Sequence, residues 1–324
     1  MAPRSGNGRR VAFVALQVAF AVTVIWFAGR ALVAQWESVG SSMRAVDLRW
    51  GRVLLSCVLV LGAYAVLFET WRVTLKIWDA HLRFAPATRI WFVSNLGRYV
   101  PGKIWQISAM GVMARREGVS PVAATGSALV VNLANIVSGC VVAFATGPSV
   151  LEVAAASGRA IAVVLVVMAL AMLLAAPWLL SWIAQRAEGI TGRAVAMPAT
   201  ISSRAVLAAV AGTGIAWLLY GFAFRLLAEG VLPASASGRA AGYIAAYVVS
   251  YLAGYLALFA PGGIGVREAV LVLALSGAGG VSQADALVLA VASRLWLTAL
   301  EVLPGVLFLL AGARFRLKET DARS

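Results

Sequence analysis

Histidine and cysteine are nearly absent from this sequence of 324 residues, which has one histidine and two cysteines. Cys57 and Cys140 both lie within long apolar stretches, where we expect them to be small core residues. Two such cysteines exclude a disulfide framework, and the solitary His81 argues against a histidine-based metal centre. We therefore expect neither a cofactor nor a metal site.

Acidic residues are also scarce: 13 aspartates and glutamates stand against 27 lysines and arginines, for a net charge of +14. Such a balance can indicate a protein that binds nucleic acid. Here most basic residues lie between apolar stretches, where they act as topology signals and contact anionic lipids. We therefore expect a membrane lipid as partner, and no nucleic acid.

Long apolar runs dominate what remains. The hydrophobic content is 62% and the mean hydropathy is +0.90, whereas soluble chains are roughly 45–50% apolar. Helices of about 20 apolar residues cross ~30 Å of hydrocarbon, so we expect an all-α polytopic membrane protein. The polar connections are too short for a soluble core, so we expect residues 1–324 to form one transmembrane domain. Full spans are predicted near 11–33, 52–71, 122–146, 159–183, 204–226 and 286–312.

The N-terminal segment has the pattern of a signal sequence, with arginines before an apolar run at 11–28. We expect it to be retained as the first span, because it corresponds to the span at 159–183 in the second half. The distribution of basic residues favours a multi-pass protein of the cell (plasma) membrane with both termini in the cytoplasm.

Two further apolar regions, 88–113 and 240–276, are each interrupted by a Pro-Gly pair. Pro101 and Pro261 are 160 residues apart, almost half the chain. A shift of 160 places the first four apolar elements on the last four, which predicts internal repeats at roughly 11–150 and 159–312. Interrupted segments at matching positions in two halves point to a transport site at the repeat interface.

The broken regions decide the topology. Region 240–276 has 37 residues, which would extend about 55 Å as one helix and is too long for a single span. We expect re-entrant hairpins with Pro-Gly at their tips, since proline ends a helix and glycine accepts unusual dihedrals. About six full spans and two hairpins make the repeats inverted, whereas the alternative of eight spans makes them parallel. The distribution of lysine and arginine favours the hairpins.

Charged and polar side chains gather at the two breaks and in the last span, where intramembrane charges are costly and usually functional. Cations near both tips, with the positive ends of half-helices, would form a pocket for an anionic group such as a lipid phosphate. The predicted substrate-binding residues are Asn95, Arg98, Gly102, Lys103, Gln106, Gly262, Gly263, Arg267, Glu268, Arg294 and Glu301.

Structural interpretations of these charges stay open at this point. Arg98 and Lys103 would extend to the headgroup layer. Arg267 and Glu268 would cap a half-helix and pair with a neighbour. Arg294 and Glu301 lie seven residues apart on one face of the last span and would form an ion pair that orders the bundle.

At these residues the chain resembles a known family, the lysylphosphatidylglycerol synthase transmembrane family, also called flippase-like domain proteins. The resemblance covers roughly residues 10–312. It implies a membrane region involved in moving aminoacylated phosphatidylglycerol between leaflets. The soluble aminoacyltransferase domain of the bifunctional relatives is not expected here, and neither is aminoacyl transfer. The resemblance rests on Arg294 and on the motifs Gly97-Arg98-Tyr99-Val100-Pro101-Gly102-Lys103 and Pro261-Gly262-Gly263-Ile264-Gly265-Val266-Arg267-Glu268.

We therefore expect a lipid flippase that moves an anionic phospholipid or polyprenyl-linked lipid through a cationic site at the repeat interface. The alternative is a non-transporting accessory protein that binds lipid or a lipid-modifying partner enzyme. An intramembrane enzyme acting on a lipid phosphate is disfavoured, because such chemistry usually needs a metal, a histidine or paired carboxylates. We expect no enzymatic activity.

Overall fold

The computed structural model describes residues 48–99, 104–147, 203–233, 238–257, 260–278 and 280–321. The predicted spans at 11–33 and 159–183, together with Pro101, Gly102 and Lys103, lie outside the described residues. The described part of the chain is helical and contains no strand. Its α-helices are α3 (Trp50–Thr74), α4 (Phe84–Asn95), α5 (Ile104–Arg116), α6 (Pro121–Thr146), α9 (Ser203–Val231), α10 (Ala240–Leu256), α11 (Val266–Ala278) and α12 (Gln283–Asp321), and its short 3-10 helices are η1 (Leu75–Trp78), η2 (Leu96–Tyr99) and η3 (Pro261–Gly263).

Four helical segments in the described residues are long and apolar enough to cross a membrane: α3 with η1, α6, α9 and the first 29 residues of α12. They coincide with four of the predicted spans, near 52–71, 122–146, 204–226 and 286–312. The predicted class, an all-α polytopic membrane protein, is therefore confirmed.

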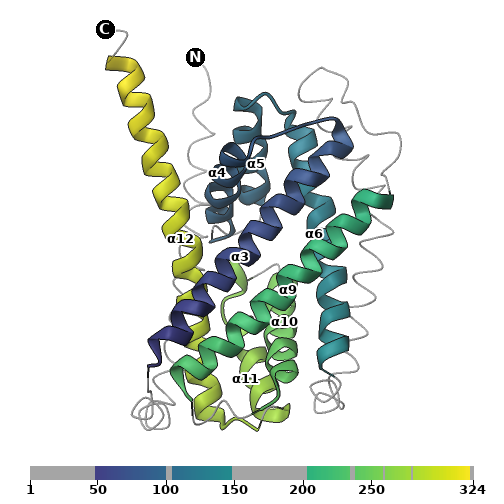
Figure 1. The fold of residues 1–324 in the computed structure, drawn as a ribbon, viewed down its shortest axis with the longest axis vertical. Helices are drawn as coiled ribbons and strands as arrows, with labels where there is room; N and C mark the ends of the chain where they lie inside the picture. Colours follow the sequence, from purple (N-terminus) through teal and green to yellow (C-terminus); the bar gives the residue numbers. More distant parts are fainter. Residues whose placement is uncertain are drawn as a thin grey trace, which may run out of the picture.

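Each broken region folds back on itself as a helical hairpin. Helices α4 and α5 pack together around η2, and α10 and α11 pack together around η3. The first hairpin enters the bundle from the top of Figure 1 and the second from the bottom. Their tips, η2 and η3, contact each other inside the bundle. This arrangement matches the predicted hairpins and not the alternative of eight full spans.

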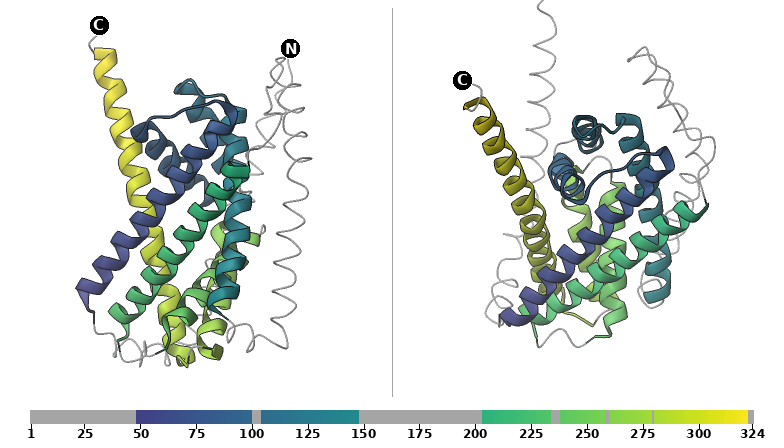
Figure 2. Two further views of the ribbon diagram at one scale, coloured as in Figure 1. Left: turned by 45° about the vertical axis from the view of Figure 1, so that its right-hand side comes forward. Right: turned by 45° about the horizontal axis from the view of Figure 1, so that its top comes forward.

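Helices α3 and α9 lie side by side and run in opposite directions across the bundle, as both views in Figure 2 show. Two glycines of α9 permit this close approach. A Cβ atom on Gly230 would lie 2.8 Å from Val53, and one on Gly212 would collide with Thr70. Small residues commonly let transmembrane helices approach closely, so that van der Waals packing holds them together. The pair forms a wall against which both hairpins are placed.

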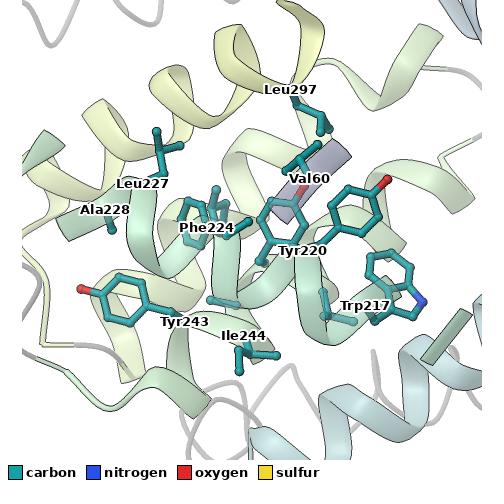
Figure 3. Close-up of a cluster of buried hydrophobic side chains, with 14 of the residues drawn as sticks. Val60, Trp217, Tyr220, Phe224, Leu227, Ala228, Tyr243, Ile244 and Leu297 are labelled. Atoms are coloured by element: carbon teal, nitrogen blue, oxygen red, sulfur yellow. The ribbon is translucent and has the colours of Figure 1, made fainter. Parts of the chain in front are cut away.

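A cluster of buried aromatic rings holds the second hairpin in position (Figure 3). Tyr220 and Phe224 of α9 pack on Tyr243 and Tyr247 of α10, and the ring centroids of Tyr220 and Tyr247 are 6.2 Å apart. Aromatic pairs at such distances contribute about 0.5–1.5 kcal/mol beyond the burial of their area. The cluster fixes α10, the arm that carries one side of the candidate site.

Candidate functional site

The tip of the first hairpin is braced by two polar side chains from opposite arms. Gln106 Nε2 of α5 donates a hydrogen bond of 2.6 Å to Oδ1 of the buried Asn95 at the end of α4. Gly97 permits this approach, since a Cβ atom there would lie 2.7 Å from the backbone nitrogen of Gln106. The predicted substrate residues Asn95 and Gln106 are thus bonded to each other, next to Arg98.

The tip of the second hairpin turns on glycines with left-handed backbone. Gly262 and Gly263 have φ of 57° and 71°, values that favour glycine. A Cβ atom on Gly263 would lie 2.8 Å from backbone atoms of Gly254 in α10. Helix α11 begins three residues after this contact and carries Arg267 in its first turn. The glycines therefore place Arg267 directly beside α10.

A cavity of about 50 Å³ lies between the hairpin tips and α12. A cavity needs about 10–15 Å³ to hold one water, so this cavity accommodates a few waters or one group of phosphate size. Five of the predicted substrate residues line it, whereas Asn95, Gln106, Gly263 and Glu268 do not. Its lining consists of Arg98, Tyr251, Gly254, Tyr255, Gly262, Arg267, Arg294, Leu297, Thr298 and Glu301.

Glu301 of α12 is the buried carboxylate of the cavity, with 3% of the residue exposed. Its Oε1 accepts hydrogen bonds from Arg98 Nη1 and, over 2.9 Å, from the hydroxyl of Tyr64 in α3. Arg98 Nη1 also donates to the hydroxyl of Tyr251 in α10 over 3.0 Å. The network therefore joins the tip of the first hairpin to three other helices.

Arg267 is the most deeply buried cation of the cavity, with 4% of the residue exposed. Its guanidinium carbon lies 5.1 Å from the ring centroid of Tyr247 and 4.9 Å from that of Tyr251. Its Nη2 atom has no hydrogen-bond partner among the described residues. Cation–π contacts of desolvated groups are worth about 2 kcal/mol, so the two rings offset only part of the cost of burying this charge.

Arg294 of α12 holds the second tip in place. Its Nη1 donates a hydrogen bond of 2.8 Å to the carbonyl of Gly262 and lies 3.7 Å from Glu268 Oε1. The other oxygen of Glu268 accepts from the backbone N–H of Gly265 over 2.7 Å, which caps the start of α11. The open interpretation of Glu268 as a cap with a charged neighbour agrees with this geometry.

Arg294 and Glu301 do not form the suggested ion pair with each other, so this interpretation is wrong. Seven residues span about 10.5 Å along a helix, so each side chain finds a nearer partner on another element. Arg294 bonds to the second tip, and Glu301 bonds to Arg98 of the first. Each therefore links α12 to a different hairpin.

The family model for the lysylphosphatidylglycerol synthase TM region matches residues 14–305. The chain belongs to this family. The resemblance seen in the two tip motifs is thereby confirmed, and membership indicates a membrane lipid-related function for a multi-pass membrane protein. No curated protein matches the chain significantly.

In this member of the lysylphosphatidylglycerol synthase TM family, the charges around the cavity do not cancel. The side chains of Arg98, Arg267 and Arg294 face those of Glu268 and Glu301, which leaves one positive charge within this group. Helix α11 also begins here, so its positive dipole end adds to the cationic character. The site is therefore suited to a group with a single negative charge.

Sequence reasoning missed the tyrosines around the charges. Tyr251 and Tyr255 line the cavity, Tyr247 supports Arg267, and Tyr64 bonds Glu301. A signal was present for the α10 members, since residues 243, 247, 251 and 255 are all tyrosines at a spacing of four. That spacing places them on one helical face, and a stripe of hydroxyl-bearing rings beside a broken segment indicates a polar lining.

Proposed function

We propose that the protein moves an anionic lipid between the two leaflets of the cell membrane, with the lipid phosphate bound in the cavity between the hairpin tips. The observation that carries this proposal is Arg267, a buried guanidinium on the cavity wall whose Nη2 lacks a hydrogen-bond partner within the described residues. Arginine is suited to phosphate because its planar fork donates two parallel hydrogen bonds.

The arrangement of the other cations supports the same ligand. Arg98 comes from the first tip, while Arg267 and Arg294 come from the helices that follow the second tip, so a phosphate in the cavity meets donors from both hairpins. The cavity has the size of a headgroup phosphate and does not accommodate acyl chains. The chains of a bound lipid would therefore remain between helices, in contact with the membrane.

The order of elements supports movement between leaflets. A long helix, a hairpin and a second long helix follow one another as α3, α4–α5, α6 and again as α9, α10–α11, α12, with opposite directions in Figure 1. We interpret these as inverted repeats, the architecture that lets a central site face each side of a membrane in turn. We place both termini in the cytoplasm, as the basic residues favour.

The test uses purified full-length protein in proteoliposomes that contain fluorescently labelled phosphatidylglycerol or, as the comparison, phosphatidylcholine. Dithionite quenching then reports the rate at which label reaches the opposite leaflet. We expect phosphatidylglycerol to move at least tenfold faster than in empty vesicles, and faster than phosphatidylcholine. Extracted lipid should be chemically unchanged, because we propose transport and not catalysis.

The decisive variant is Arg267→Met, which removes the charge and the hydrogen-bond donors and puts a shorter apolar side chain of similar volume in their place. Replacing a buried charge by an apolar residue of similar volume is often neutral or stabilising, so thermal stability should be retained. Transport of phosphatidylglycerol should fall to the background rate, while Arg115→Ala, at an exposed position of α5, should leave it unchanged. Wild-type rates in folded Arg267→Met would contradict the proposal, and binding without movement would favour the accessory protein.

A further inference from the structure

The cavity contains an anionic group of its own. The carboxylate of Glu301 forms a hydrogen-bonded ion pair with Nη1 of Arg98, and both residues line the cavity together with Arg267. Arg98 is partly exposed, with 23% of its side chain accessible, whereas Glu301 is buried. A phosphate that enters the cavity therefore meets an arginine whose Nη1 is already bonded to a carboxylate.

We propose that Glu301 competes with the lipid phosphate for Arg98, so that the phosphate binds by displacing this carboxylate, and that Tyr64 is the positioning residue that holds the displaced group. The inference rests on the proposed function and adds the residues that set the affinity of the site. The affinity for the lipid then depends on the free-energy difference between Arg98 bonded to the phosphate and Arg98 bonded to Glu301.

A phosphate can offset the loss of the contact between Arg98 and Glu301 because its several oxygens accept hydrogen bonds from more than one arginine. Glu301 accepts a hydrogen bond from Arg98 Nη1 through its oxygen Oε1. A phosphate group has several oxygens, so it can bond Arg98 and at the same time the Nη2 atom of Arg267, which lacks a partner in the part of the chain that the structure describes. The ligand thereby gains a donor, Arg267 Nη2, that the carboxylate of Glu301 does not use.

Displacement also changes which elements are connected. Arg98 lies on η2 at the first tip, and Glu301 lies on α12, so their contact ties the first hairpin to the last helix. When a phosphate binds Arg98 in place of Glu301, this contact is lost, whereas Arg294 of α12 still donates a hydrogen bond to Gly262 of the second tip. The same exchange that binds the lipid thus removes the ion pair between the first tip and α12 and leaves the hydrogen bond between α12 and the second tip in place.

The proposal predicts opposite changes in ligand affinity when Tyr64 and Glu301 are altered. Its hydroxyl donates to the same Oε1 of Glu301, and the residue is 2% exposed. Before displacement Tyr64 shares this oxygen with Arg98, whereas after displacement it is a donor that remains, so its hydrogen bond then stabilises the buried carboxylate more strongly than before. Removing the hydroxyl therefore makes displacement harder and weakens ligand binding, whereas neutralising Glu301 removes the competitor and strengthens it.

The experiment titrates the full-length protein in detergent micelles by calorimetry with dihexanoyl phosphatidylglycerol, dihexanoyl phosphatidylcholine and inorganic phosphate. We expect Glu301→Gln to bind the phosphatidylglycerol about tenfold more tightly than wild type, equivalent to about 1.4 kcal/mol. Tyr64→Phe should bind it about threefold to tenfold more weakly. In the double variant the effect of Tyr64→Phe should disappear, because it acts through Glu301.

Controls separate this inference from simple damage to the fold. Glu69→Gln alters a peripheral carboxylate, paired with Arg72 over 2.7 Å, and should leave the affinity unchanged. If Glu301→Gln does not fold, Glu301→Met also removes the competitor and should show the same increase. Thermal unfolding verifies each variant.

The outcomes are distinguishable. Wild-type binding of phosphatidylglycerol with no increase in the Glu301 variants, or weakening by both Glu301→Gln and Tyr64→Phe, would overturn the competition and leave the proposed function standing. Absence of binding to every form would overturn both. Inorganic phosphate that binds as tightly as the lipid would assign the site to free phosphate and refute its lipid ligand.

Discussion

Replacement of Gly263 by alanine should be among the most damaging single-methyl changes in the second hairpin. The residue has φ of 71°, where an L-residue costs roughly 1–2 kcal/mol. The added Cβ would also lie 2.8 Å from Gly254 Cα and carbonyl oxygen, which are backbone atoms that cannot rotate away. Overpacking of this kind costs about 1–3 kcal/mol, so we expect a total loss of about 2–5 kcal/mol in unfolding free energy.

Gly265→Ala is the matched control in the same tip. Gly265 also has a positive φ, of 85°, but a Cβ atom there meets nothing within 4 Å. Only the conformational cost of roughly 1–2 kcal/mol should apply. Denaturation of both variants in detergent, followed by tryptophan fluorescence, measures the difference, which should be about 1–3 kcal/mol.

Two results would refute this reasoning. Equal losses in Gly263→Ala and Gly265→Ala would show that the contact with Gly254 is unimportant. A strictly additive double variant Gly254→Ala/Gly263→Ala would show the same, because residues in direct contact should couple. Since Arg267 follows this tip, Gly263→Ala should also slow lipid movement more than Gly265→Ala does.

Two further variants probe the first tip. Arg98→Ala leaves Glu301 buried without this cation and should lower the unfolding free energy by about 3–5 kcal/mol. In the double variant, Glu301→Gln should restore part of this loss. Full additivity of the two substitutions would argue against their pairing. Gln106→Ala removes the donor of Asn95 and should cost about 1–3 kcal/mol in the same denaturation assay, whereas a change below the error of the assay would mean that this bond does not brace the hairpin.

The hairpins could be predicted because their signals are local. Proline and glycine interrupt apolar runs at Pro101 and Pro261, and the length of 240–276 leaves room for two arms but suits no single span. The structure has α10 and α11 as these arms, with φ values at Gly262 and Gly263 that explain the two glycines. Dihedral preference and hydropathy act over a few residues, so one sequence is enough to read them.

The partners of the charges could not be predicted in the same way. Arg98 and Glu301 are 203 residues apart in sequence, and Tyr64 and Glu301 are 237 apart. Such contacts depend on how helices cross, which hydropathy does not encode. The expectation that Arg294 would pair with Glu301 followed from spacing along one helix and failed because neighbouring elements supplied closer partners. The repeats, and the roles of Gly102 and Lys103, stay predictions.

The bond between Arg98 and Glu301 has a consequence for how the protein is made. Ribosomes add about 5–20 residues per second, so the 203 residues between them take roughly 10–40 s to synthesise. During that interval the first hairpin is complete while the carboxylate that will bind its arginine does not yet exist. The first hairpin is therefore inserted while Arg98 still lacks Glu301. The contact between this tip and α12 forms only after α12 has been synthesised, as a late step of biogenesis.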